Sequence, residues 1–291
     1  MLFGMGAYVA VGLFFALSAL RAYQLNRLPL HGRMELYPVP AEKGREYGGS
    51  YLEESEWWTK PRQVSHLAEL AEMGGEIILI KRLFRGSRRF WLASWPFHFG
   101  MYCLFVWTLL LILTAFTGAG AVGALRVLTA LCGLLGFLLG GGGALLLLGR
   151  RLTDECLRIY TSPGEYLNLA LLLLAFLTGL CLWYGGGAPF DAARLAMRDV
   201  LTLSYTPAGA LAAVHLSLVY GLLIYIPLSK MSHYVGKFFS FHRFLWDNAA
   251  NLKDSAVAAR VEQALKNKPR TAWSAAHVAP APAADREGEK A

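Results

Sequence analysis

Apolar residues in this chain of 291 residues are gathered into five runs that are almost free of charge. An uncharged apolar run of about 18 residues or more can cross the hydrocarbon core of a bilayer as a helix. Nearly all Lys, Arg, Asp and Glu lie between or after these runs. The pattern therefore predicts an all-α membrane protein, a bundle of five transmembrane helices over residues 2–21, 96–118, 122–149, 166–186 and 208–229.

Basic residues indicate the orientation of these helices. No basic residue precedes the first run, and Arg21 and Arg27 follow it, which favours an uncleaved span with the N-terminus outside over a signal peptide. Twelve Lys or Arg lie in 21–95, three in 150–165, ten after residue 229, and three in the other loops and their flanks. Because cytoplasmic loops are enriched in Lys and Arg, the first three segments are predicted to be cytoplasmic. The net charge of +8 is then mainly a topology signal, and no nucleic-acid-binding fold accompanies it.

The chain is expected to divide into four parts: a first transmembrane helix (1–21), a long cytoplasmic insert (22–95), a four-helix membrane core (96–246) and a cytoplasmic tail (247–291). A helix is expected within the tail, over 253–267, and the Ala/Pro-rich remainder is predicted to be disordered.

The insert begins with a segment rich in Pro, Gly, Tyr and Glu, 22–60, which predicts an extended loop. Apolar residues then recur every three or four positions, as in an amphipathic helix, which we expect to be broken or bent at Gly74-Gly75. Four arginines and three aromatic residues between 82 and 91 suit either a helix at the membrane surface or a contact face for a cytoplasmic partner. In the third run, four successive glycines, 140–143, predict tight helix packing or, less simply, a flat ligand close to the backbone.

The four cysteines exclude several metal centres by their spacing. Cys103, Cys132, Cys156 and Cys181 form neither C-x-x-C nor C-x-x-C-H. This excludes a cysteine-ligated iron–sulfur cluster or a zinc ribbon, and it argues against covalently attached c-type haem.

Histidines are the main candidates for chemistry in the spans. His98 begins the second run, His215 lies near the outer start of the fifth, and His233 lies where the extension of the fifth run leaves the membrane. Ionisable residues within spans are costly, so each is a candidate functional residue. The other histidines fall in the insert, the tail or just beyond the last span and are expected to be solvated: His31, His66, His242 and His277.

The spacing of His215 and His233 suggests a shared helix face. They are 233 − 215 = 18 positions apart, about five full turns and about 27 Å along a continuous α-helix. This spacing is what two cofactor sites stacked across the membrane would need. The alternative is that such a histidine packs helices together by bonding to a carbonyl of a neighbouring helix.

A b-type haem needs two axial ligands from facing helices and no covalent attachment motif. His98 is the only histidine in another span, and the start of the second span should meet the end of the fifth. His98 and His233 therefore form a sensible pair of ligands, with His242 as a rival to His233.

The chain resembles the gamma (cytochrome b) subunit family of respiratory nitrate reductases and its relatives in heterodisulfide-reductase-like and sulfate-reducer transmembrane complexes. The resemblance rests on PFHFGMYCLFVW (96–107), on the two histidines and basic exit of HLSLVYGLLIYIPLSKMSHYVGKFF (215–239), and on five spans with an outside N-terminus. It covers roughly 1–20 and 90–240, and the insert is longer than in the nitrate-reductase members.

The resemblance implies two b haems that pass electrons between a quinone pool and cytoplasmic iron–sulfur partners in a prokaryotic cytoplasmic membrane. His98 and His233 resemble the iron ligands of the haem nearer the cytoplasm, and His215 resembles one ligand of an outer haem. The family's second outer ligand would lie ten residues after His98, where this chain has Thr108. The outer haem is then missing, five-coordinate or bound by an unexpected second ligand. The candidates for such a ligand on the outer side are Cys181 and Met197.

The expected function is a haem b membrane subunit of a respiratory redox complex, without catalysis on its own. It would link membrane quinone to a cytoplasmic, heterodisulfide-reductase-like iron–sulfur subunit, with one haem or two. Arg88, Arg89 and Lys237 could pair with haem propionates or simply anchor the chain at the membrane surface. A haem-free anchor or assembly subunit is the alternative, and a transporter is disfavoured because Asn168 and a few threonines are nearly the only polar groups in the spans.

Overall fold

The computed structural model describes residues 2–27, 65–117, 123–185, 189–240 and 253–266. Within these residues the chain is helical, without strands, and five helices are long and apolar enough to span a membrane: α1 (Leu2–Asn26), α4 (Arg88–Thr114), α5 (Gly123–Thr153), α7 (Pro163–Tyr184) and α9 (Ala210–Leu228). The predicted all-α bundle of five membrane helices is thereby confirmed, whereas the side on which the N-terminus lies stays a prediction.

Shorter helices connect the spans: α2 (His66–Leu79), α3 (Lys81–Gly86), α6 (Glu155–Tyr160), α8 (Pro189–Leu201), the 3₁₀ turn η4 (Lys230–Ser232), α10 (His233–Ser240) and α11 (Ala256–Lys266). Helix α11 agrees with the helix predicted over 253–267. The extended loop predicted for 22–60 is wrong in its first residues, because α1 continues to Asn26. The remainder of that loop from residue 28, the predicted disordered end of the tail, and His31, His242 and His277 lie outside the described residues.

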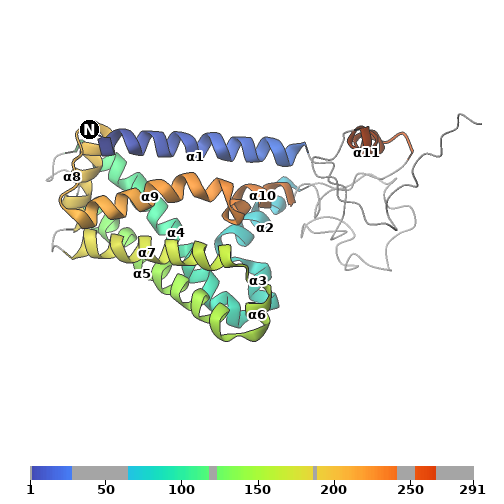
Figure 1. Ribbon diagram of the computed structural model, residues 1–291, viewed down its shortest axis with the longest axis horizontal. Helices are drawn as coiled ribbons and strands as arrows, with labels where there is room; N and C mark the ends of the chain where they lie inside the picture. Colours follow the sequence, from blue (N-terminus) through green and yellow to red (C-terminus); the bar gives the residue numbers. More distant parts are fainter. Residues whose placement is uncertain (1, 28–64, 118–122, 186–188, 241–252, 267–291) are drawn as a thin grey trace, which may run out of the picture.

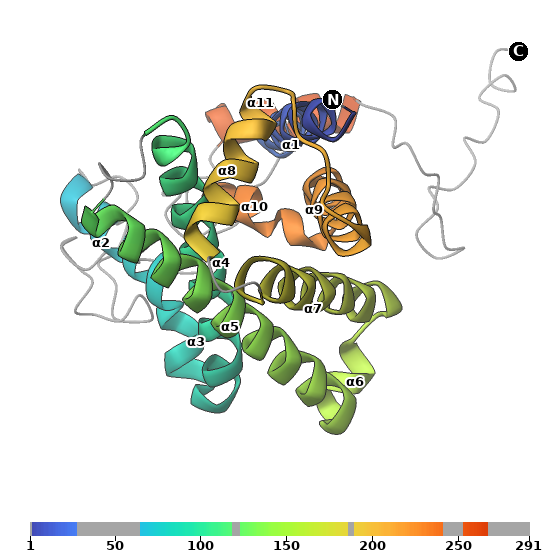
Figure 2. The ribbon, with the colours of Figure 1, turned by 90° about the vertical axis from the view of Figure 1, so that its left-hand side faces the viewer.

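The connecting helices divide between the two ends of the bundle. Figure 1 shows α2, α3, α6 and α10 at the end opposite the N-terminus, while α8 lies at the end where α1 begins. The described parts of the three segments predicted to be cytoplasmic thus meet at one end, as the charge pattern requires. At the other end α8 packs against α1, α4, α5 and α7 and covers the end of the bundle (Figure 2).

The two most closely packed spans, α4 and α5, meet through glycine. A Cβ built on Gly100 would lie 2.3 Å from the backbone nitrogen of Gly140, and one built on Gly143 would lie 2.5 Å from that of Phe97. A Cβ built on Gly142, by contrast, would meet nothing within 4 Å. Tight helix packing, the simpler interpretation of the glycine row, is therefore confirmed at Gly140 and Gly143.

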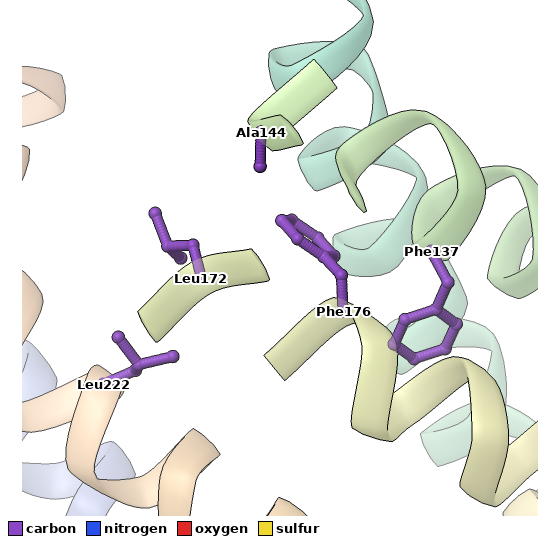
Figure 3. Close-up of a cluster of buried hydrophobic side chains, with 5 residues drawn as sticks. All are labelled: Phe137, Ala144, Leu172, Phe176 and Leu222. Carbon is purple, nitrogen blue, oxygen red and sulfur yellow. The ribbon is translucent and has the colours of Figure 1, made fainter. Parts of the chain in front are cut away.

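The buried core joins α5, α7 and α9. Figure 3 shows its five fully buried members, two aromatic and three aliphatic: Phe137, Ala144, Leu172, Phe176 and Leu222. Helix α1 is attached mainly to α9, where Tyr220 Oη donates to the Phe3 carbonyl at 3.0 Å, and several of its large apolar side chains are exposed. Exposed apolar side chains on a helix of this length suit contact with lipid.

The bend predicted in the insert helix lies elsewhere. Helix α2 runs through Gly74-Gly75 without interruption, and the chain turns at Ile80, whose φ of 49° and ψ of 50° are left-handed. The left-handed conformation is costly for a β-branched residue, so contacts beyond the turn must hold it. One of them joins Glu76 Oε2 to the backbone N–H of Arg82 at 2.9 Å.

Side chains of α4 hold the other end of this turn. The last carbonyls of α2 accept hydrogen bonds from three aromatic side chains of α4: Leu79 from Trp91 Nε1 (2.7 Å), Ile78 from Trp95 Nε1 (3.1 Å) and Ile77 from Tyr102 Oη (2.6 Å). Carbonyls in the last turn of a helix have no partner within the helix, so these bonds satisfy them and fix α2 against α4.

The second span also begins earlier than predicted. Helix α4 starts at Arg88, so the boundary drawn between insert and membrane core at residues 95 and 96 falls inside a continuous helix with Pro96 in its interior. The Ser87 hydroxyl caps this helix by accepting from the Phe90 N–H at 3.4 Å.

Helix α8 was not predicted. It places the buried Arg194 against carbonyls that follow α4, and the Arg194 guanidinium donates to the Thr117 carbonyl at 2.9 Å.

Candidate functional site

His98 lies on α4 with one ring nitrogen already engaged. Its Nδ1 is 2.7 Å from the Ser94 carbonyl oxygen, one turn earlier in the helix. A carbonyl only accepts, so Nδ1 carries the proton and Nε2 is left with a free lone pair. Ligating histidines commonly have this arrangement, in which the bond at one nitrogen fixes the ring and the other nitrogen faces the metal.

His233 is the first residue of the short helix α10. Helix α9 ends at Leu228, just after Pro227, and Ser229 is extended, with φ of −99° and ψ of 179°. The Ser229 hydroxyl accepts from the Met231 N–H at 3.1 Å and begins the 3₁₀ turn that leads into α10. The interpretation of His215 and His233 as two points on one continuous helix is therefore wrong, because the chain leaves the α-helical path between them.

The rings of His98 and His233 nevertheless lie close together. Their ring centroids are 6.1 Å apart and their planes are inclined by 73°. Among the described residues, no hydrogen bond is made to the ring of His233, and the residue is exposed. The structure thus brings together the two histidines that the sequence pairs, each from a different helix.

The spacing of these rings suits a shared metal. Two imidazoles that bind one metal from opposite sides, each with its nitrogen about 2 Å from it, have ring centres roughly 6 Å apart. Together with the bare Nε2 of His98, this separation fits a b-type haem held by His98 and His233. The groups of three or more His, Cys, Asp or Glu that other metal sites need are absent from the described residues.

His215 has a different environment, on the side of α9 that faces α7. It is 5% exposed, and its Nδ1 lies 3.0 Å from the hydroxyl of Thr178. That hydroxyl donates its proton to the Leu174 carbonyl at 2.7 Å, so it accepts from Nδ1–H of His215. Like His98, His215 therefore has an oriented ring with an unprotonated Nε2.

Aromatic side chains occupy the space around His215. Phe137 and Trp183 meet its ring edge-on, with centroids 6.5 and 6.3 Å away. The ring is so close to α7 that a Cβ on Gly179 would lie 2.8 Å from His215 Cε1 and 2.3 Å from Phe137 Cε1. Side chains of α5 and α7 thus pack directly against the His215 ring.

Among the described residues, none of the candidate opposite ligands contacts His215. The Thr108 hydroxyl donates to the carbonyl of Leu104 in its own helix at 2.9 Å, and Cys181 is exposed. Met197 lies on α8, and no contact joins it to His215 among the described residues. The residues present at this end therefore do not fit a second haem.

Two of the three basic residues considered for haem propionates, Arg88 and Lys237, have other partners. The Arg88 guanidinium lies over the ring of Phe84, 5.1 Å from its centroid, and Lys237 pairs with Glu76 at 3.0 Å. Sequence reasoning also missed the two groups that orient the histidines, the Ser94 carbonyl and the Thr178 hydroxyl. The four-residue spacing from Ser94 to His98 offers a weak signal for the first, and nothing in the sequence links Thr178 to His215.

Comparisons with protein-family models, with curated proteins and with solved structures give no match to this chain.

Proposed function

We propose that this chain is a b-type cytochrome subunit with a single haem, held by His98 and His233, in a membrane redox complex. It transfers electrons between membrane quinone and a cytoplasmic iron–sulfur partner. The observation that carries the proposal is the close pair of imidazole rings, with centroids 6.1 Å apart, at the same end of the bundle as the insert.

Haem iron, when bound, supplies reversible one-electron exchange, and the protein contributes ligation and environment. The Ser94 carbonyl keeps the proton of His98 on Nδ1, so that Nε2 is available as a ligand. Phe97, in edge contact with the His98 ring and packed into the core, keeps that side of the site apolar. Nonpolar surroundings favour electron transfer by limiting the access of water to the site.

The second site is not part of the proposal. Because His215 is enclosed by aromatic residues without a facing ligand, we assign it a structural role in packing α9 against α7. Electrons would then enter and leave the chain through one haem near the insert.

The proposed partners follow from the resemblance and from the arrangement of the molecule. The insert helices α2 and α3 and the site-bearing helix α10 share one end, so a cytoplasmic iron–sulfur subunit docked there would lie close to the haem. Quinone would approach from the lipid, in a prokaryotic cytoplasmic membrane.

The deciding experiment is haem stoichiometry. We would purify the protein, measure haem b per chain by pyridine haemochrome, and repeat the measurement for His98→Ala, His233→Ala and the control His66→Ala. We expect one haem in the wild type and in the control, and none in the other two variants. A wild-type protein without haem, isolated from cells that make haem, would overturn the proposal and leave the haem-free anchor. Reduction of the bound haem by a quinol analogue tests the link to quinone.

A further inference from the structure

Helix α10 is too short to hold His233 in place by itself. It has eight residues and is separated from α9 by the extended Ser229 and a 3₁₀ turn. Isolated helices of this length are unstable in water, so the position of α10 depends on tertiary contacts.

Helix α10 packs on α1 and is also contacted by a side chain of α2. Tyr234 bonds to Ser18 of α1 at 2.5 Å and stacks on Phe14 with ring centroids 5.8 Å apart. Lys237, one turn after His233, forms an ion pair with Glu76 of α2 at 3.0 Å. Figure 1 shows α2 and α10 at the same end of the bundle.

The contact with α2 has the features of a rigid anchor. The Glu76 side chain is only 7% exposed, and its two oxygens have separate partners, Lys237 Nζ and the Arg82 backbone N–H. Glu76 is the buried partner and Lys237 is 35% exposed, so the charge of Lys237 stabilises a carboxylate that is largely shielded from water. Helix α2 is in turn fixed to α4, the helix of His98, by the aromatic hydrogen bonds to its last carbonyls.

We propose that Glu76, in the insert, is a positioning residue for the haem site, because its ion pair with Lys237 holds α10 so that His233 faces His98. This inference rests on the proposed function. It gives the insert a role in building the site besides receiving a partner, since it ties the helix of one ligand to the helix of the other.

Glu76→Gln tests this with little other change. The Gln side chain can still accept from the Arg82 N–H, but it has no charge for Lys237. The matched control is Glu72→Gln, one turn earlier in α2, where a similarly buried carboxylate pairs with Lys81 at 2.6 Å. That pair lies within the insert and includes no residue of α10.

The readouts are haem affinity, measured by transfer of haem to an excess of apomyoglobin, and the low-spin EPR spectrum, which reports the orientation of the axial imidazoles. Loss of groups that orient metal ligands typically weakens metal binding 10- to 100-fold, so we expect roughly tenfold weaker haem retention and an altered EPR signal in Glu76→Gln. Lys237→Gln should have the same effects, and Glu72→Gln should behave as wild type. The double variant Glu76→Lys/Lys237→Glu should recover part of the loss.

Wild-type haem retention and an unchanged EPR signal in both Glu76→Gln and Lys237→Gln would overturn the inference while leaving the proposed function intact. A wild-type protein without haem would instead overturn the proposed function. Should Glu76→Gln fail to accumulate in membranes, Lys237→Gln alone decides, since Lys237 is the more exposed partner and its replacement leaves the Glu76–Arg82 bond in place.

Discussion

The Thr178 hydroxyl joins two helices by accepting from His215 Nδ1 at 3.0 Å and donating to the Leu174 carbonyl in its own helix. One hydroxyl thereby fixes the tautomer and the orientation of a buried imidazole between α7 and α9. This relationship explains how a histidine can be kept inside a membrane helix without an iron ion: its polar N–H is satisfied by a neighbouring helix.

Thr178→Val should therefore destabilise the bundle without loss of haem. Valine has nearly the shape of threonine, so the main change is that the His215 N–H loses its partner, at a cost of about 1–3 kcal/mol. Unfolding of the detergent-solubilised protein, followed by circular dichroism, measures this, and haem per chain is measured alongside. Thr178→Ser, which keeps the hydroxyl, is the control. Loss of haem in Thr178→Val alone would contradict the structural role of His215.

The glycine row offers a pair of adjacent substitutions with opposite expectations. Gly143→Ala would place a Cβ 2.5 Å from the backbone of Phe97, which forces α4 and α5 apart, whereas Gly142→Ala meets nothing within 4 Å. Overpacking of this kind costs about 1–3 kcal/mol, and more when the contact is backbone. We expect Gly143→Ala to lower stability and, because Phe97 neighbours His98, to lower haem content as well.

Both glycine variants are compared by thermal unfolding in one detergent and by haem per chain. Gly142→Ala is expected to be neutral or slightly stabilising, since alanine favours the helix more than glycine does. Equal stability of the two variants would show that the α4–α5 contact is looser than the structure describes.

The spans and the pairing of His98 with His233 could be predicted because they depend on simple properties of the sequence. Uncharged runs of sufficient length give the spans directly, and two antiparallel spans have the start of one level with the end of the other. That argument does not require a continuous helix, which is why the two rings meet although α9 ends at Leu228.

The predictions that failed depended on contacts distant in the sequence. Gly74-Gly75 is a weak point in an isolated helix, but the bonds that α4 makes to the last carbonyls of α2 move the turn to Ile80. The environment of His215 is likewise set by residues of α5 and α7, Phe137 and Thr178 among them. Helical periodicity places His215 on a face but does not indicate what fills the space opposite.

Tyr102→Phe should loosen the insert while leaving the membrane core intact. Tyr102 Oη donates to the Ile77 carbonyl at 2.6 Å, and its loss removes one bond, worth about 0.5–1.5 kcal/mol, that fixes α2 to α4. Local unfolding should then make the backbone after the arginines of α3, which is helical in the folded protein, accessible to protease. We expect faster tryptic cleavage between residues 81 and 89 in membranes, with unchanged haem per chain. Tyr160→Phe, at an exposed position on α6, should not alter the cleavage rate.

The orientation of the bundle can be tested with the cysteines that the chain already has. Cys156 is exposed on α6, at the end predicted to be cytoplasmic. In a variant that keeps Cys156 and has serine at the other three cysteines, a membrane-impermeant maleimide should label inverted vesicles and not right-side-out ones. A cysteine-free variant carrying Ser204→Cys, at an exposed position between α8 and α9, should show the reverse.

The reverse pattern at both positions would place the insert and the His98–His233 pair on the outer side. Electron exchange with a cytoplasmic iron–sulfur partner would then be impossible through this pair alone. The charge asymmetry makes the expected outcome clear, because 25 of the 28 Lys and Arg lie in segments predicted to be cytoplasmic, including the 12 of residues 21–95.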